Sequence, residues 1–244
     1  MARRRFFAPP AAFHKQTVTL TGDEAKHLRS VLRLKVGDEV SVFNGEGQEF
    51  KCTVAQLRRD EVELDQQEEI QPTHPESPLS LTLGVALLKG EKFDLVVQKA
   101  TELGVTNIVP VMTRHADIHL RDASDAEKRV TRWRRIAMEA AKQCGRARVP
   151  AIEMPESFDS VIQHGAAEVR LLFSERDGEA FRVAGSVKSV VAVVGSEGGW
   201  SDEELSLARE AGWQIVTLGG RVLRAETAAI TVSVLMQHLY GDLK

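Results

Sequence analysis

The chain has 244 residues, with 32 Lys and Arg against 35 Asp and Glu, 43% hydrophobic residues and two cysteines. That length supplies one large domain or two modest ones, and the composition excludes general disorder. The cysteine count excludes a disulfide scaffold and a cysteine-based zinc site, and charged residues interrupt every apolar run before it could cross a bilayer. The basic start of the chain lacks the apolar segment of a secretory signal, so we expect a cytoplasmic protein.

The net charge of −3 conceals two basic segments. Residues 1–35 carry eight basic and two acidic side chains, and residues 121–148 carry nine and four. Such segments can form a phosphate-binding surface, because contacts with backbone phosphates dominate nucleic-acid affinity. Solvated helix faces paired with nearby acids are the alternative, and charge alone slightly favours that alternative.

The first part of the chain, residues 16–70, alternates polar and apolar residues as short strands do. We expect strands at 17–20, 39–43, 50–54 and 61–64, a turn at 44–47, and a helix over 23–34 in which Ala25, Leu28, Val31 and Leu32 recur at helical spacing. This arrangement predicts a small antiparallel barrel. Three prolines within residues 71–78 predict a linker after it.

From Leu79 onward, strands and helices alternate. We expect strands at 79–88, 107–112, 169–173, 190–194 and 214–218, and helices at 93–103, 125–144, 201–212 and 225–240. Ser201 and Glu204 have the spacing of a capping box, and Trp133 falls on the apolar face of its helix. The alternation predicts an α/β domain whose mainly parallel sheet has helices on both faces.

Two glycine-rich loops follow strands of this predicted sheet. The first is Gly195-Ser-Glu-Gly-Gly-Trp200, and the second runs from Gly219 to Ala229 and contains Arg221, Arg224 and Glu226. Ligands bind beyond the carboxyl ends of strands in open parallel sheets, and glycines let the backbone approach a ligand closely. Neither loop matches a dinucleotide fingerprint or a P-loop. Tight turns alone would explain one such loop, whereas two of them favour a binding site.

Two other patterns are weaker. His115 and His119 have metal-like spacing but no evident third ligand, so we expect no metal. Cys144 ends an apolar helix face, which is typical of a packing residue rather than a nucleophile.

The run Val194-Gly-Ser-Glu-Gly-Gly-Trp-Ser201 and the later run Leu218-Gly-Gly-Arg-Val-Leu-Arg-Ala-Glu-Thr-Ala228 resemble the paired signature of the SPOUT methyltransferase superfamily. More closely, the chain resembles the 16S ribosomal RNA uridine N3-methyltransferases of that superfamily. Further matches are Lys89-Gly-Glu-Lys92, residues 98–105, residues 143–146 with 149–150, and residues 27–33, so the likeness spans nearly the whole chain. Ser196 departs from the proline that is usual there.

The resemblance implies a PUA-like RNA-binding barrel over residues 1–72, a linker at 73–78 and a trefoil-knotted SPOUT domain over 79–244. It also implies S-adenosylmethionine as cofactor and a homodimer joined through the last helix. The implied cofactor residues are Leu172, Gly195, Glu197, Gly198, Gly199, Leu218, Gly219, Leu223, Thr227 and Ala228.

The implied activity is methylation of a uridine N3 in the 16S rRNA of the 30S ribosomal subunit. Arg224 and Glu226 are the candidate catalytic residues, for orienting RNA or stabilising negative charge and for accepting a proton, although Glu226 could equally be an acid at a helix N-terminus. The candidate RNA-binding residues are Arg3, Arg4, Arg5, Arg29, Arg33 and Arg146. Two alternatives stay open: a SPOUT enzyme acting on another RNA, such as a tRNA ribose, and a non-catalytic RNA-binding assembly factor.

Overall fold

A computed structural model describes residues 4–118, 120–181 and 185–244. The chain forms two compact units, each continuous in space but not in sequence. The first contains the described residues up to Glu76 together with Met138–Val149, and the second contains Ser77–Ala137 with Pro150–Lys244. The sequence predicts a division near residues 73–78 and gives no sign that 138–149 pack with the first unit.

The first unit contains a curled sheet of six strands in the order β1-β4-β5-β6-β3-β2. All neighbouring pairs are antiparallel except β1 with β4. The strands are β1 (Arg5–Phe7), β2 (Phe13–His14), β3 (Thr17–Thr21), β4 (Glu39–Phe43), β5 (Glu49–Leu57) and β6 (Glu61–Ile70), with a 3-10 turn η1 (Pro10–Ala12). The expected strands are all present, and β6 runs six residues beyond its predicted end.

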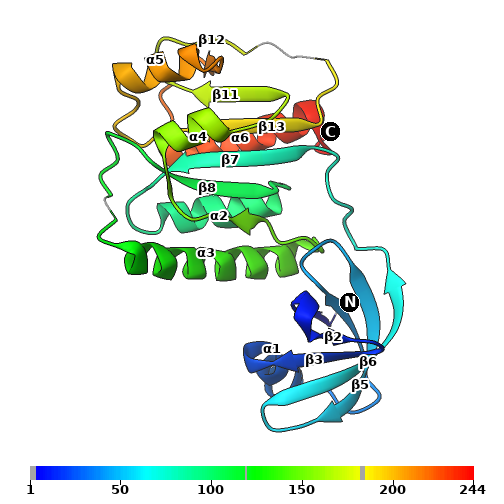
Figure 1. Ribbon diagram of the computed structural model, residues 1–244. Coiled ribbons are helices and arrows are strands. Elements are labelled where there is room, and N and C mark those ends of the chain that lie inside the picture. Colours follow the sequence, from blue (N-terminus) through cyan, green and yellow to red (C-terminus); the bar gives the residue numbers. More distant parts are fainter. Residues whose placement is uncertain (1–3, 119, 182–184) are drawn as a thin grey trace. The chain divides into compact units, whose positions relative to one another are not determined.

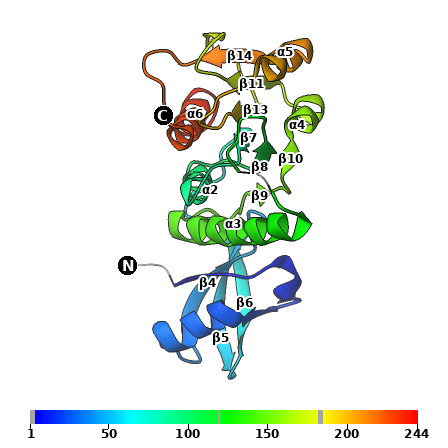
Figure 2. The ribbon, with the colours of Figure 1, turned by 90° about the vertical axis from the view of Figure 1, so that its left-hand side faces the viewer.

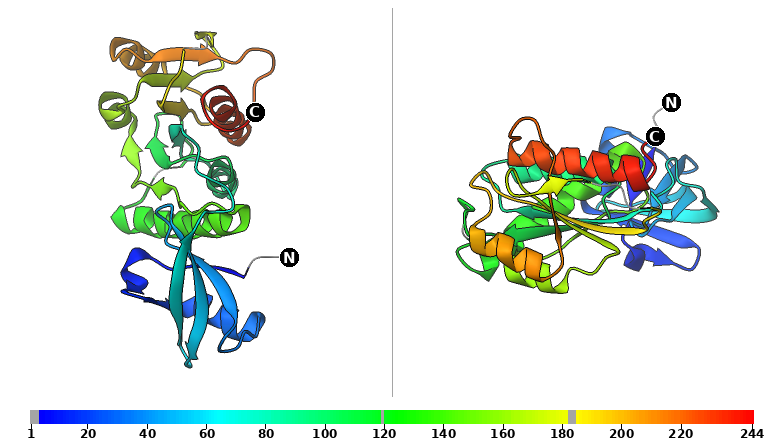
Figure 3. Two further views of the ribbon diagram at one scale, coloured as in Figure 1. Left: turned by 90° about the vertical axis from the view of Figure 1, so that its right-hand side faces the viewer. Right: turned by 90° about the horizontal axis from the view of Figure 1, so that it is seen from above.

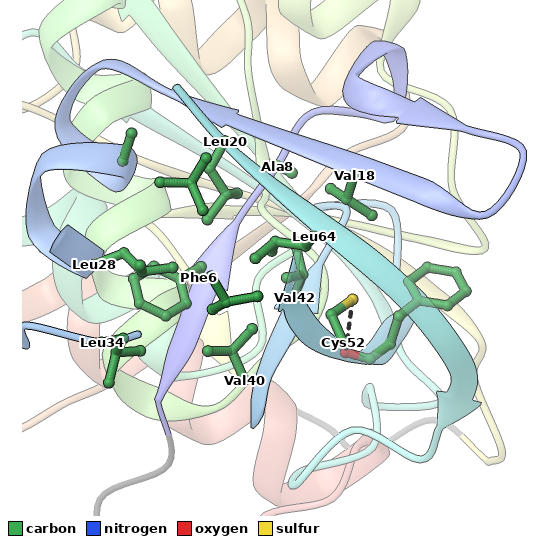
Figure 4. Close-up of a cluster of buried hydrophobic side chains, with 14 residues drawn as sticks. Phe6, Ala8, Val18, Leu20, Leu28, Leu34, Val40, Val42, Cys52 and Leu64 are labelled. Atoms are coloured by element: carbon green, nitrogen blue, oxygen red, sulfur yellow. Dashed lines mark hydrogen bonds between the residues drawn. The ribbon is translucent and has the colours of Figure 1, made fainter. Parts of the chain in front are cut away.

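The core of this unit lies inside the curled sheet, where alternate residues of each strand point inward. Figure 4 shows Phe6, Val42 and Leu64 meeting there, and all three are fully buried. Leu28, from the helical segment after β3, packs into the same cluster. The alternating pattern of the sequence therefore predicts this core correctly.

The helix predicted over residues 23–34 is wrong in its second half. The structure has a short helix α1 (Gly22–Lys26) followed by a π-helical turn η2 (His27–Val31). Leu28 and Leu34 are both buried, whereas the side chain of Val31 is 66% exposed. The wide turn, with Arg33 at φ 53°, brings Leu34 back to the core, so Val31 does not share the buried face that regular helical spacing predicts.

The second unit is a parallel sheet in the order β10-β8-β7-β13-β11-β14-β12, with β9 paired to β8 (Figure 1). The strands are β7 (Ser80–Ala86), β8 (Asn107–Met112), β9 (Ala151–Ile152), β10 (Glu156–Ser157), β11 (Val169–Phe173), β12 (Glu179–Ala180), β13 (Ser189–Val194) and β14 (Gln214–Thr217). The central strands β7 and β13 are buried along most of their length. Such continuous apolar strands are what a sheet covered on both faces requires.

Helices cover both faces of this sheet. Figure 2 shows the sheet edge-on, with α2 and α6 on one face and α4 and α5 on the other, and the views in Figure 3 agree. The helices are α2 (Lys92–Glu102), α3 (Ala123–Cys144), α4 (Phe158–His164), α5 (Asp202–Glu210) and α6 (Ala225–Tyr240). The predicted α/β class is confirmed.

The strand order places β11 between β13 and β14, although β13 and β14 are consecutive long strands. The connection from β13 to β14 therefore crosses β11, and α6 then packs back against β13, β7 and α2. This order brings the two glycine-rich loops to neighbouring positions. The trefoil knot itself stays a prediction.

Trp133 lies in the core, as its helical spacing predicts. Its side chain is 3% exposed, its ring packs on Phe93, and its Nε1 donates a hydrogen bond to Asp94 Oδ1 (3.0 Å). Arg132 forms an ion pair with the same carboxylate. These contacts join α2 to the first part of α3 within the second unit.

Candidate functional site

A pocket of about 290 Å³ lies at the carboxyl ends of three adjacent parallel strands, β13, β11 and β14. This is where open parallel sheets bind ligands. The residues that line it come from the ends of these strands, the loops that follow them and the start of α6: Phe173–Glu175, Val194–Trp200, Val216–Leu223, Ala225 and Ala228. Both glycine-rich loops predicted to be functional thus line one pocket.

The loop after β13 is fixed by the capping box that follows it and by a hydrogen bond to β11. Ser201 and Glu204 form the predicted capping box, which fixes the start of α5. Trp200 is 2% exposed, and its Nε1 donates a hydrogen bond to the carbonyl oxygen of Phe173 (2.8 Å). Gly199 has φ 67°, and a β-carbon there would lie 2.5 Å from Oε1 of Glu175. The positive φ therefore favours glycine at this position, and a larger residue would also displace the Glu175 carboxylate.

A second segment, residues 113–117, supports the same loop from outside the pocket. Ser196 Oγ donates a hydrogen bond to the carbonyl oxygen of His115 (3.1 Å), and Nδ1 of His115 lies 3.2 Å from the carbonyl oxygen of Gly198. The backbone N–H of Arg114 donates to Oε1 of Glu204 (2.9 Å). The serine that departs from the resembled pattern thus has a specific hydrogen-bonding role in this chain.

The loop after β14 presents glycines and apolar side chains. Gly219 and Gly220 have φ 76° and 74°, both are exposed, and a β-carbon at either would meet no atom within 4 Å, so a ligand can approach their backbone groups closely. Leu218 and Leu223 are each more than one-third exposed within the pocket lining, and Val222 is 82% exposed. Exposed apolar side chains beside open backbone groups are typical of a small-molecule site.

Charged side chains gather beside the pocket. Nζ of Lys92, the first residue of α2, donates a hydrogen bond to Oε1 of Glu197 in the pocket lining. That hydrogen bond lowers the pKa of Glu197 and raises the pKa of Lys92. Arg224 and Glu226, at the start of α6, lie close enough to influence the pKa of Lys92. One oxygen of Glu226, Oε2, is buried without a hydrogen-bond partner in the described part of the chain.

Most of the predicted cofactor residues line the pocket: Gly195, Glu197, Gly198, Gly199, Leu218, Gly219, Leu223 and Ala228. Leu172 does not, because its side chain is fully buried in the apolar core with Val193 and Trp200. Thr227 is exposed and lies outside the lining. Arg224 and Glu226 lie beside the pocket rather than in its wall.

The sequence prediction names Leu172 of β11 but not the three residues that follow it, which are the ones that line the pocket. Phe173, Ser174 and Glu175 line the pocket, and Glu175 adds a carboxylate to it. No glycine cluster or motif marks this segment. Only the strand order, with β11 between the two loop-bearing strands, indicates its place in the site.

Two of the arginines predicted to bind RNA are buried, and we correct that prediction. Arg5 donates to Oε2 of Glu49 (3.1 Å) and to the carbonyl oxygen of Arg146 just after α3 (2.8 Å). It also donates to the carbonyl oxygens of Ala141 and Lys142 in the last turns of α3. Arg146 is 6% exposed and pairs with Glu76 (2.7 Å). Both guanidinium groups therefore stabilise the first unit from within instead of facing solvent.

Three of the remaining candidates stay accessible. Arg33 is exposed, and Arg4 is half-exposed and forms an ion pair with Asp38 (3.3 Å). Arg29 is partly buried and donates to the carbonyl oxygen of Arg58 (2.8 Å). Arg3 lies outside the described residues.

Within the described parts of the chain, no group of three or more His, Cys, Asp or Glu side chains is placed to hold a metal ion. His119, the second histidine of the metal-like spacing, lies outside those parts. Burial raises the pKa of the Cys52 thiol to about 12, so this cysteine is a packing residue. No described helix has the length and apolarity needed to span a membrane.

Comparisons with known families show the class of protein to which the chain belongs. A family model described as an RNA methyltransferase domain matches residues 75–237, and one described as an RNA methyltransferase PUA domain matches residues 20–66. With a matched methyltransferase domain and a matched PUA domain, the chain is an RNA methyltransferase.

Curated relatives narrow this class. Ribosomal RNA small subunit methyltransferase E of a Synechocystis strain is 33% identical over 231 residues, covering 92% of this chain and 74% of its own length. The Bacillus subtilis protein of the same name is 30% identical and covers 93% of both chains. The chain belongs to the ribosomal RNA small subunit methyltransferase E family.

Solved structures give the same result. The Neisseria gonorrhoeae ribosomal RNA small subunit methyltransferase E, bound to S-adenosyl methionine, matches with a TM-score of 0.87 and 33% identity, covering 99% of this chain and all of that one. A Legionella pneumophila structure in complex with the same cofactor matches with a TM-score of 0.90 and 31% identity over the full length of both chains.

Proposed function

We propose that this protein transfers the methyl group of S-adenosylmethionine to N3 of a uridine in the 16S rRNA of the small ribosomal subunit. The observation that carries the proposal is the single pocket formed by both glycine-rich loops at the ends of β13, β11 and β14. Because this substrate is part of the ribosome, the protein acts in the cytoplasm.

The pocket residues fit S-adenosylmethionine. Open backbone groups at Gly219 and Gly220 suit the edges of an adenine, and Leu218 and Leu223 supply apolar walls. The carboxylates of Glu175 and Glu197 suit a ligand that carries a positive sulfonium and an amino group. When bound, the cofactor supplies an electrophilic methyl group.

The chain's own residues prepare the uracil. N3 must lose its proton before its electron pair can attack the methyl carbon, and this needs a proton acceptor and a way to stabilise negative charge. The proposed proton acceptor is Glu226, whose buried Oε2 has no hydrogen-bond partner in the described part of the chain. The residue proposed to orient the RNA is Arg224, which precedes α6 and is exposed.

RNA binding by the first unit uses its accessible arginines, the exposed Arg4 and Arg33 and the partly buried Arg29. Their contacts with phosphates supply affinity, whereas choice of the target base requires presentation by the ribosome. Affinity for the subunit will therefore fall steeply with salt.

A homodimer completes the proposal. The apolar helix α6 buries Val232 and Met236 against its own unit but leaves Val234 40% exposed, with Leu235 half-buried. A helix that is apolar on nearly all sides needs a second surface to cover it. Light scattering of the purified chain tests this, and a monomer at micromolar concentration contradicts it.

Methyl transfer to purified 30S subunits tests the activity. Subunits that lack the modification are incubated with the protein and S-adenosylmethionine labelled in the methyl group, with free 16S rRNA and tRNA in parallel. Label in 30S subunits supports the proposal. Label in tRNA alone indicates a different RNA target, and no transfer despite cofactor binding indicates a non-catalytic factor.

A further inference from the structure

Lys92 links α2 to the pocket, although it belongs to neither glycine-rich loop. It follows β7, the strand next to β13, and its ammonium group donates a hydrogen bond to Glu197. The side chains of Lys92 and Glu197 are 36% and 34% exposed, so their ion pair lies at the protein surface and is open to a substrate.

The ammonium group retains hydrogen-bonding capacity. It has three N–H donors, and in the described part of the chain Glu197 is the acceptor recorded for it. The charged groups that influence the pKa of Lys92 are Glu197 from the loop after β13, and Arg224 and Glu226 from the start of α6. The negative charge of Asp117 in turn opposes the lowering of the pKa of Glu197. Lys92 is thus a cation with free donors, held by Glu197 of the pocket lining, and the carboxylate of Glu226, which has an unpartnered oxygen, acts electrostatically on it.

This pair of groups matches the chemistry of uracil N3. The N3–H lies between two carbonyl groups, O2 and O4, which share the negative charge when the proton leaves. In the reaction the N3–H bond breaks and the proton passes to a carboxylate. The electron pair on N3 then forms the N3–CH3 bond, while the pair of the broken S–CH3 bond stays on sulfur. A cation that donates to O2 or O4 stabilises the charge at the moment it develops.

We propose that Lys92 is a further catalytic residue, which donates a hydrogen bond to a carbonyl oxygen of the target uracil while Glu197 holds its ammonium group in place. This inference rests on the proposed function. If Lys92 only anchored the cofactor loop, its loss would lower the affinity for the cofactor. Because we propose a catalytic role, its loss should instead lower the methylation rate at saturating cofactor.

The test compares Lys92→Met, Lys92→Arg and Lys99→Met. Lys99 is a matched control, because it lies on the same helix, is 38% exposed and pairs with Glu102. Single-turnover methylation of 30S subunits is measured at saturating S-adenosylmethionine over a range of pH, and cofactor affinity is measured by calorimetry.

Lys92→Met is expected to lower the rate about 100-fold while its cofactor affinity stays within about threefold of wild type. Its rate should keep rising to higher pH than that of wild type, because the uracil anion has lost its stabilising cation. Lys92→Arg should recover most of the rate, and Lys99→Met should match wild type.

Two results overturn the inference: a Lys92→Met rate equal to wild type at saturating cofactor, or a defect confined to cofactor affinity. The wild-type reaction is the reference in both cases. If wild type itself fails to methylate the subunit, the proposed function fails, and this outcome is distinct from a failure of the Lys92 variant alone.

Discussion

Trp200 Nε1 donates a hydrogen bond to the carbonyl oxygen of Phe173 (2.8 Å), which ties the glycine-rich loop after β13 to the end of β11. Trp213 forms a similar bond with the carbonyl oxygen of Ile162 (2.9 Å), but it does not line the pocket. Substituting each tryptophan in turn therefore distinguishes an effect on the stability of the fold from an effect on cofactor binding.

Trp200→Phe and Trp213→Phe should each lower the free energy of unfolding by about 2 kcal/mol, because each leaves a buried carbonyl without its donor. Only Trp200→Phe should also weaken S-adenosylmethionine binding, by about tenfold. Urea denaturation and calorimetry measure the two effects. Equal cofactor affinity in both variants would contradict the role of Trp200 in shaping the pocket.

Gly198→Ala should weaken cofactor binding by at least about tenfold. A β-carbon at Gly198 would lie 2.7 Å from both the carbonyl oxygen and Cβ of His115, so the loop must move away from its supporting segment. Gly185→Ala is the control, because its β-carbon would meet no atom within 4 Å. Calorimetry on both variants checks this, and unchanged affinity in Gly198→Ala would show that the loop adapts freely.

Arg5→Met should destabilise the first unit by about 3 kcal/mol, because the fully buried Glu49 loses its partner. Arg33→Gln should leave stability unchanged and lower the affinity for 30S subunits, because Arg33 is exposed. Hydrogen exchange of the β4 and β5 amides and subunit binding at two salt concentrations separate these outcomes. An Arg5→Met protein that is as stable as wild type but binds RNA less tightly would contradict this and indicate that Arg5 contacts RNA.

The Lys92–Glu197 ion pair should persist over a wide range of pH. Its hydrogen bond holds the pKa of Glu197 below the ordinary 4.5 and the pKa of Lys92 above the ordinary 10.5. The stability from Glu197 is therefore fully present above pH 4.5 and disappears as the pH falls through its folded pKa, and that from Lys92 disappears only as the pH rises through its raised value. The stability difference between wild type and Lys92→Met, from unfolding curves, should be constant between these limits. A difference that changes near neutral pH would contradict the pairing.

Much of this fold follows from local sequence patterns. The bounds of β4, β8, β11 and α6 agree with their predicted ranges, because each is a continuous periodic segment with clear ends. The wide turn at His27–Val31 does not follow, because the need to bury both Leu28 and Leu34 overrides regular helical spacing. The burial of Arg5 and Arg146 depends on partners more than 40 residues away, which a count of charges does not reveal.

The site shows the same division. Glycine loops after β13 and β14 are visible in the sequence, but their closeness depends on β11 lying between those strands. Glu175 enters the pocket for that reason and carries no local signal of its own. Lys92 belongs to one of the matched sequence motifs, but its partner Glu197 lies 105 residues further along the chain. The two side chains meet only once the sheet has formed.

The most direct test of the central claim is nucleoside analysis of 16S rRNA. Subunits that lack the modification are treated with this protein and S-adenosylmethionine carrying a heavy methyl group, the rRNA is digested, and the nucleosides are separated by mass spectrometry. We expect one N3-methyluridine per subunit, carrying the heavy methyl group. Unmodified rRNA from a folded, cofactor-binding protein, or the label on a ribose or another base, would contradict it.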